Sequence, residues 1–260
     1  MKTLKKIAIA CALLVSIIGI SAFICQEPDK KNTATGVAEG KSFAVLELFT
    51  SEGCNSCPPA EQLLEKLGKE SAGKPIYVLN YHVDYFDHLG WKDAFGSREN
   101  TRRQQEYSTW LNSQVYTPQL VVNGTAEFIG SDEKAVRSAI ASQLSIKHQG
   151  ILSVSVHKTG KQIKVDYLSG NTGDQDDLIL GLIQKNGSSN VLRGENAGLR
   201  FSHIQIVRNL QSVSLKQSSS GSREFYIPLE NNMEKWEVIG IIQNRKTGRI
   251  TAVDTAQVNQ

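Results

Sequence analysis

Cysteine is scarce in this sequence, with four residues among 260. Two of the four, Cys11 and Cys25, lie in the apolar N-terminal stretch or directly after it. The other pair, Cys54 and Cys57, is too small a set for a disulfide-stapled mini-domain, and a chain of this length can bury its own core. A zinc ribbon would need a second CxxC or two closely spaced histidines, and neither is present. The pair therefore indicates a redox-active disulfide or another kind of metal site.

Most of the chain has no net charge. The formal net charge is +3. Lys2, Lys5 and Lys6 contribute three positive charges with no acid beside them, which leaves zero for the remainder. Without a basic patch, the sequence predicts no nucleic-acid partner.

The first 25 residues have the pattern of an export signal. Lysines precede an uncharged, mostly apolar run at 7–24, so residues 1–25 are predicted to direct the chain to the periplasm or cell envelope. Three fates stay open: cleavage near Ala22, lipidation of Cys25 as in a lipoprotein, or retention as a membrane anchor, for which the run is almost long enough. Residues 26–41 are polar and are predicted to be a linker.

Residues 42–149 are predicted to form an α/β domain. An apolar strand at 43–49 leads through the CxxC turn into an amphipathic helix, and the apolar run at 76–83 indicates a buried parallel strand. Further elements are expected at 97–111 (helix), 119–122 and 127–129 (strands joined by a tight turn) and 132–144 (helix). This order, βαβα followed by ββα, is typical of the thioredoxin fold.

The two cysteines are the predicted redox centre. They lie where a strand runs into a helix, whose free amides and dipole favour a thiolate. Cys54 is predicted to be the exposed nucleophile and Cys57 the buried thiol that resolves the mixed disulfide. A helix end contributes on the order of 0.3–1 kcal/mol, under one pKa unit. Since Glu52 also opposes the thiolate, we expect the pKa of Cys54 to lie only modestly below about 8.5, and the couple to be reducing.

Two further positions join the catalytic set. Thr117-Pro118 directly precedes the strand at 119–122, where thioredoxin-like proteins hold a cis proline opposite the CxxC, and a cis X–Pro bond costs only about 0.5–1 kcal/mol. Thr117 would then meet an extended peptide by strand addition; the alternative is a trans proline that starts an edge strand. Glu47, an acid in an apolar strand, is predicted either to take the proton from Cys57 or to occupy a partly hydrated strand position.

A polar and aromatic cluster follows the strand at 76–83. It includes His82, Asp84 and Trp91, at the strand edge where α/β folds place sites. Three interpretations stay open: the residues bind substrate beside the thiols, His82 joins the two cysteines in a copper or zinc site, or the segment is a hydrogen-bonded loop.

Residues 150–260 are predicted to form a β-sandwich of immunoglobulin-like type. The strands are expected at 151–156, 162–167, 178–183, 211–215, 224–229, 236–243 and 250–253, with a turn at Asn186-Gly187. The segment 193–198 with His203 is too polar and glycine-rich for a strand. It is interpreted as a turn network or, alternatively, as an interdomain or binding loop.

Four runs of sequence resemble a known family. They are VLELFTSEGCNSCPPAE, YHVDYFDHLGWKDAF, VYTPQLVVNG and RGENAG with a following His203. From about Val45 to Gln243 the chain resembles the bacterial secreted, thioredoxin-like domain family of unknown function. The resemblance implies a thioredoxin-like fold followed by a β-rich domain, and it leaves activity and substrate open. Phe86 stands where Trp is expected in the family's HVDYWD-like segment.

The leading hypothesis is an exported, two-domain thiol-disulfide oxidoreductase that exchanges disulfides with envelope proteins. It needs no cofactor beyond the redox-active Cys54–Cys57 pair. Two alternatives stay open: a copper- or zinc-handling protein that uses these thiols with His82, and a non-catalytic binding module whose sandwich recognises a partner.

Overall fold

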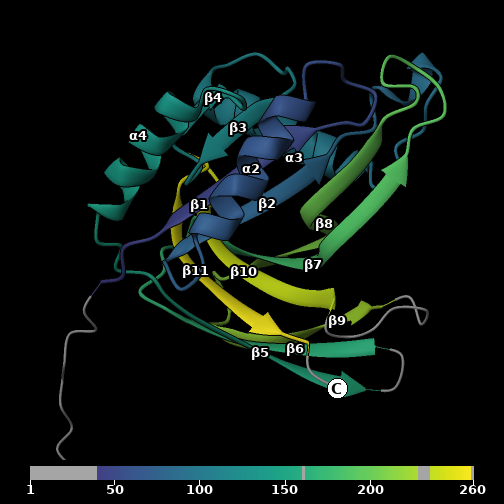
Figure 1. Cartoon of the computed structure of the whole chain (residues 1–260). Coiled ribbons are helices and arrows are strands. Elements are labelled where there is room, and N and C mark those ends of the chain that lie inside the picture. Colours follow the sequence, from purple (N-terminus) through teal and green to yellow (C-terminus); the bar gives the residue numbers. More distant parts are fainter. Residues whose placement is uncertain (1–39, 160–161, 228–234, 259–260) are drawn as a thin grey trace, which may run out of the picture. The chain divides into compact units, whose positions relative to one another are not determined.

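An eight-stranded mixed sheet forms the centre of the part of the chain that the structure describes. The structure, a computed structural model, describes residues 40–159, 162–227 and 235–258. The strands of the large sheet follow the order β11-β10-β7-β8-β2-β1-β3-β4, and β5, β6 and β9 form a second, smaller sheet (Figure 1). The result is a mixed α/β fold.

The first half of the sequence contains the predicted order of elements. These are β1 (Ala44–Thr50), α2 (Pro58–Glu70), β2 (Ile76–His82), the 3₁₀ turn η1 (Asp87–Leu89), α3 (Arg98–Leu111), β3 (Gln119–Val122), β4 (Ala126–Ile129) and α4 (Glu133–Leu144). Strand β1 lies at the middle of this half, parallel to β2 and antiparallel to β3. Asp132 is the N-cap of α4, because its side chain accepts a hydrogen bond from the amide of Ala135.

The side chains of β1 point alternately to the two faces of the sheet and pack in two different hydrophobic cores. Ala44, Leu46 and Leu48 pack with the apolar faces of α2 and α4. Val45 and Phe49 point to the other face, where they pack with residues of α3 and of strands from the second half. Because side chains alternate in a strand, one buried strand serves both faces of the sheet.

The second half of the sequence extends this sheet instead of forming a separate sandwich. Its strands are β5 (Ile151–Thr159), β6 (Gln162–Gly170), β7 (Asp176–Asn190), β8 (Arg200–Ser214), β9 (Ser220–Tyr226), β10 (Trp236–Asn244) and β11 (Ile250–Gln257). The predicted immunoglobulin-like sandwich is therefore not shown as a domain of its own, since β7, β8, β10 and β11 lie in the sheet that contains β1. A single compact unit spans Glu39–Gln260.

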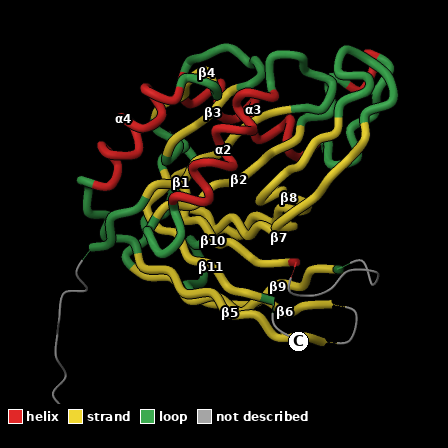
Figure 2. Tube along the Cα trace, viewed as in Figure 1, coloured by secondary structure: helices red, strands yellow, loops and turns green. Residues whose placement is uncertain are grey.

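Two sheets do pack face to face in the second half. The small sheet of β5, β6 and β9 lies beside β10 and β11 (Figure 2), and its inward side chains share one core with those of β7 and β10. The alternating burial of β6 shows the pattern that such packing requires. The predicted half-buried strands are therefore found, in strands that belong to two different sheets.

The predicted turn at Asn186-Gly187 is wrong. Both residues lie inside β7 of the long β7–β8 hairpin, with Gly187 opposite His203. A Cβ at position 187 would lie 2.8 Å from the Phe95 ring and 2.6 Å from the Ile206 side chain. Gly187 thus lies within a strand at a position where neighbouring side chains approach the backbone closely. Sequence alone does not distinguish such a glycine from a turn glycine.

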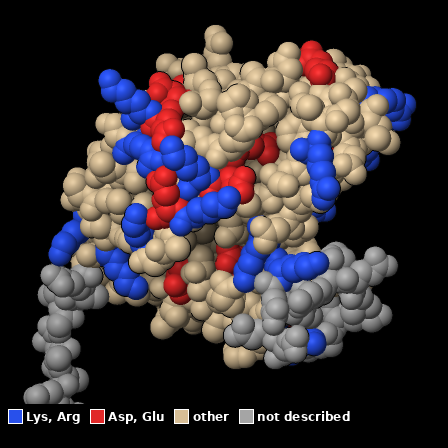
Figure 3. All heavy atoms as spheres, viewed as in Figure 1, with Lys and Arg blue, Asp and Glu red and all other residues tan. Residues whose placement is uncertain are grey.

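The outward faces of α2 and α4 carry paired charges of both signs (Figure 3). Lys66 contacts Glu133, which also contacts Arg137, and Arg137 reaches back to Glu70. Exposed pairs of this kind contribute little to stability. The outward faces of these two helices therefore carry paired charges of both signs.

The predicted export signal and most of the predicted linker lie outside the described residues. Within the described residues, no helix has the length and apolar character needed to cross a membrane.

The burial of His148 leads us to expect that the stability of the protein depends on pH. His148 is 7% exposed, its ring packs on Phe43 with centroids 4.4 Å apart, and its Nε2 has no hydrogen-bond partner. Burial, together with the charge of Arg249, lowers the pKa of His148. The unfolded chain therefore binds more protons below about pH 6.5, and stability should fall as the pH drops through this value.

Urea unfolding between pH 8 and pH 5 checks this expectation. His148→Asn should flatten the pH dependence of the free energy of unfolding relative to the wild type. His157→Asn is the matched control, because the His157 side chain is 65% exposed. Equal pH dependence in His148→Asn and wild type would contradict the prediction.

Candidate functional site

The Cys54–Cys57 pair forms a disulfide at the start of α2. The two Cα atoms are 5.4 Å apart, and Cys57 is the N-cap residue of the helix. Prolines at the first two helical positions fit there, because the amides of a first turn have no partner within the helix. The predicted close pair at a helix N-terminus is therefore found in the structure.

The predicted exposure of the first cysteine is wrong for this disulfide state. Cys54 is 2% exposed and Cys57 is 0% exposed, whereas Asn55 and Ser56 between them are exposed. The turn thus presents its middle residues to solvent and keeps both sulfurs inside. Cys54 is therefore almost fully covered in this disulfide state.

The predicted cis peptide at Thr117-Pro118 is confirmed. The Ser56 hydroxyl lies 3.4 Å from the sulfur of Cys54 and 3.5 Å from the carbonyl oxygen of Thr117. Pro118 and Ala60 of α2 both flank Gly130, because a Cβ at position 130 would be 3.1 Å from Pro118 and 3.0 Å from Ala60. The structure therefore brings Cys54, Cys57, Thr117 and Pro118 together.

A loop of the second half contacts the CxxC turn. The side-chain amide of Asn196, which is 4% exposed, donates to the carbonyl oxygens of Glu52 and Cys54 at 2.8 and 2.9 Å. Gly194 of the same loop lies against Trp91, because a Cβ there would be 3.4 Å from the Trp91 Cβ. The segment interpreted as a turn network or, alternatively, as an interdomain or binding loop thus contacts the redox turn and bonds to its backbone.

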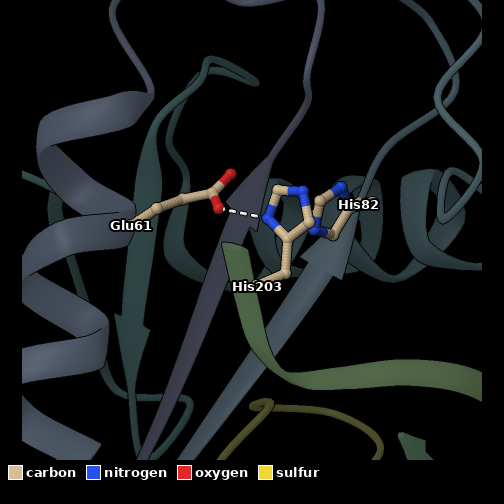
Figure 4. Close-up of side chains that lie close together, drawn as sticks. All are labelled: Glu61, His82 and His203. Atoms are coloured by element: carbon tan, nitrogen blue, oxygen red, sulfur yellow. Dashed lines mark hydrogen bonds and ion pairs between the residues drawn. The ribbon is translucent and has the colours of Figure 1, made fainter. Parts of the chain in front are cut away.

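His203, on β8, lies between two buried carboxylates. Its Nδ1 is 2.5 Å from Glu61 Oε2 (Figure 4). Its Nε2 is 3.0 Å from Glu52 Oε1. Burial opposes the charged ring, but the bonds to Glu52 and Glu61 outweigh burial and raise the pKa of His203 to about 9. Burial likewise opposes ionisation of Glu61, yet the bond to His203 and its charge lower the pKa of Glu61. A buried ion triad therefore joins β8 to the CxxC turn and α2.

His82 belongs to a second pair beside this triad. Its Nδ1 is 2.7 Å from Asp93 Oδ2, and its ring meets the His203 ring edge to face with centroids 4.5 Å apart. Burial raises the pKa of Asp93, but the charge of His82 and the bond to it outweigh burial, and the net pKa is lowered. Asp93 also accepts from the amide of Glu52 at 2.9 Å.

The other two predicted binding residues lie in different surroundings. Trp91 Nε1 donates to Glu52 Oε2 at 2.7 Å, which places Trp91 at the edge of the redox turn. Asp84 accepts from the Thr101 hydroxyl at 2.6 Å and so ties its loop to α3. Substrate binding by His82, Asp84, Trp91 and Thr117 stays a prediction.

Glu47 lies on the face of β1 opposite α2, which carries Cys57. Its Oε1 accepts from Arg103 Nε at 2.7 Å, and its other oxygen accepts from the Tyr107 hydroxyl. Arg103 and Glu47 are 4% and 0% exposed, and Arg103 also donates to Gln243 of β10 at 3.1 Å. The structure thus places Glu47 in a buried ion pair that joins β1, α3 and β10.

Five functional candidates were not among the predicted site residues: Glu52, Glu61, Asp93, Asn196 and His203. One of them has a readable signal, because Glu61 follows Cys57 by four residues and so lies on the same helix face. His203 and Asn196 come from about 140 residues further along the chain, and no local pattern connects them to the cysteines.

Residues 45–243 match the model of a protein family, DUF1223, described as a protein of unknown function. Over 100 residues the chain is 32% identical to a thioredoxin of Methanocaldococcus jannaschii, a match that covers 38% of this chain and 94% of that protein.

Two solved structures are similar over most of the chain. A crystal structure of a protein from Agrobacterium tumefaciens has a TM-score of 0.64 at 26% identity and covers 86% of this chain and 97% of that chain. HBP35 of Porphyromonas gingivalis has a TM-score of 0.58 at 12% identity and covers 84% and 76% of the two chains. At that identity, the second likeness shows the fold alone.

The position of Glu47 predicts a structural effect of its replacement. Glu47→Gln leaves the buried Arg103 charge without its partner, so the free energy of unfolding should fall by about 3 kcal/mol. The rate of reduction of the Cys54–Cys57 disulfide should keep its dependence on pH, because Glu47 is on the far face of β1. Urea unfolding and stopped-flow reduction measure the two quantities.

Glu65→Gln is the matched control. It removes the same charge from an exposed pair with Lys69, and the loss should stay below about 1 kcal/mol. A shifted pH profile in Glu47→Gln alone would restore Glu47 to a role in proton transfer.

Proposed function

Because the chain belongs to the DUF1223 family, whose description assigns no reaction, we propose from its own site that it exchanges disulfides with other proteins through Cys54 and Cys57. The observation that carries the proposal is the close cysteine pair at the start of α2 beside Thr117 and Pro118. The similarity to a thioredoxin over 100 residues supports it, and we infer that the first half of the chain is a thioredoxin-like domain.

The reaction transfers two electrons and needs only the two thiols. In the reduced protein, the Cys54 thiolate attacks one sulfur of a client disulfide; a new S–S bond joins Cys54 to the client, and the client's second sulfur leaves as a thiolate that takes up a proton. Cys57 loses its proton, attacks the Cys54 sulfur and releases the client's first sulfur as a thiol. The client is reduced and the Cys54–Cys57 disulfide is formed; the reverse sequence oxidises a client.

Partner and location follow from the same hypothesis. The export pattern of residues 1–25 places the reaction in the periplasm or cell envelope, where protein disulfides persist. The clients are protein thiols and disulfides of that compartment. Thr117 provides the backbone for the client segment, and Trp91, held by Glu52, forms an edge of the site.

A trapping experiment tests the proposal. In the full chain, Cys57→Ser cannot resolve the mixed disulfide, so covalent adducts through Cys54 should accumulate in the native envelope and disappear on reduction. The double variant Cys54→Ser/Cys57→Ser is the control for the thiols of Cys11 and Cys25. Equal trapping by the single and double variants would overturn the assignment of Cys54 as the nucleophile.

The cysteine variants also distinguish this proposal from the two alternative functions, a metal-handling protein and a non-catalytic binding module. If the reduced wild type binds stoichiometric metal and replacement of either cysteine abolishes this binding, a metal site of Cys54, Cys57 and His82 is favoured. A phenotype unchanged by loss of both cysteines would favour a non-catalytic binding module.

The loop contact predicts a change in reactivity. Asn196→Ala removes two hydrogen bonds to the redox turn, each contributing about 0.5–1.5 kcal/mol. If the turn must move before Cys54 reacts, reduction of the disulfide by a small dithiol should become about 10-fold faster, as expected for a barrier about 1.4 kcal/mol lower. Stopped-flow kinetics on the oxidised protein measure the rate.

Asn190→Ala is the matched control, because Asn190 is an exposed asparagine at the end of β7. Its rate should equal that of the wild type. An unchanged rate in Asn196→Ala would mean that the loop does not restrict access to Cys54.

A further inference from the structure

Three buried side chains from separate elements converge beneath the CxxC turn. Glu61 of α2, His82 of β2 and His203 of β8 can each place one nitrogen or oxygen atom within 4.8 Å of the others (Figure 4). We propose that these three residues bind a divalent transition-metal cation such as Zn²⁺, through one carboxylate oxygen and one ring nitrogen of each histidine. Two histidines and a glutamate are a ligand set that zinc uses in proteins.

His82 presents a free ligand atom. Asp93 Oδ2 lies 2.7 Å from Nδ1, so in the neutral ring that binds a metal the proton belongs on Nδ1 and the lone pair is on Nε2. His82 is 0% exposed, and its Nε2 has no hydrogen-bond partner. A buried polar nitrogen without a partner is unfavourable. A cation at Nε2 would satisfy this atom.

His203 has the same arrangement with the two nitrogens exchanged. Its Nε2 is 3.0 Å from Glu52 Oε1, so the proton on Nε2 is held by a carboxylate, and Nδ1 faces Glu61 Oε2 at 2.5 Å. Both histidines therefore show the pairing with a carboxylate that orients metal-binding rings. The cation takes the place of the proton between Nδ1 and Glu61.

The geometry requires only short movements. Ligand atoms around tetrahedral zinc, with bonds of about 2.0–2.1 Å, lie about 3.3 Å from each other. The Glu61–His203 pair must therefore open from 2.5 Å, and the most distant pair must close from at most 4.8 Å. Side-chain shifts of about 1 Å achieve both.

The surrounding charges favour a cation. Three carboxylates, Glu52, Glu61 and Asp93, face the two rings, and all three are buried. Each keeps a further donor: Thr50 for Glu61 at 2.9 Å, Trp91 for Glu52 at 2.7 Å and the Phe95 amide for Asp93 at 2.8 Å. A divalent cation balances more of this negative charge than the single proton it displaces.

Metal titration of the oxidised full chain tests the proposal. After treatment with a chelator, Zn²⁺ measured by calorimetry should bind with one-to-one stoichiometry and raise Tm. Co²⁺ should give d–d absorption without a thiolate charge-transfer band. Binding should persist in Cys54→Ser/Cys57→Ser, so failure of this proposal is distinguishable from failure of the redox proposal.

Ligand replacement locates the site. His82→Asn and Glu61→Gln should each weaken Zn²⁺ binding by at least about 100-fold, and Asp93→Asn, which leaves the three ligands in place, by about 10- to 100-fold. His148→Asn is the matched control: His148 is also buried with an unpartnered Nε2 but lies outside the cluster. Its affinity should not change.

Two results would overturn the proposal. One is the absence of stoichiometric Zn²⁺ binding to the oxidised wild type. The other is equal affinity in the wild type and in those ligand variants that are folded by circular dichroism. With two ligand variants and Asp93→Asn beside them, the loss of one variant to misfolding still leaves the comparison intact.

Discussion

A charged histidine held between two carboxylates joins distant parts of this chain at its reactive turn. His203 contacts Glu52, two residues before Cys54, and Glu61, four residues after Cys57. All three side chains are buried, so each charge depends on the others: removal of one leaves an uncompensated charge in a low-dielectric interior, at a cost of several kcal/mol. The backbone around the cysteines is therefore fixed by a residue of the second half.

This link lies beside a sheet that contains strands of both halves of the sequence. Strand β8 extends the sheet of the first half, with Asn80 of β2 opposite Ile206, and it brings His203 to the side of the redox turn. The buried pair of Glu47 and Arg103 makes a second connection through Gln243 of β10. Two polar clusters, one on each side of β1, thus hold the strands of the second half to the first.

Local patterns accounted for much of the fold and for the centre of the site. Strand, CxxC, proline pair and helix are adjacent in sequence, and the Thr117-Pro118 peptide precedes its strand directly, so their geometry follows from local backbone preferences. The face of Glu47 was harder to assign. The alternation of β1 groups it with Val45 and Phe49, but both faces of this strand are buried, so hydrophobicity does not identify which face meets α2.

The sequence by itself determined the secondary structure of the first half, the cysteine pair and the half-buried strands of the second half, because each depends on spacing within a few residues. Only the tertiary structure decided which strands share a sheet, that Cys54 is covered in its disulfide state, and that Glu61, His82 and His203 meet. These features depend on contacts across more than a hundred residues. A hydrophobic period specifies which face of a strand is buried, but not which partner buries it.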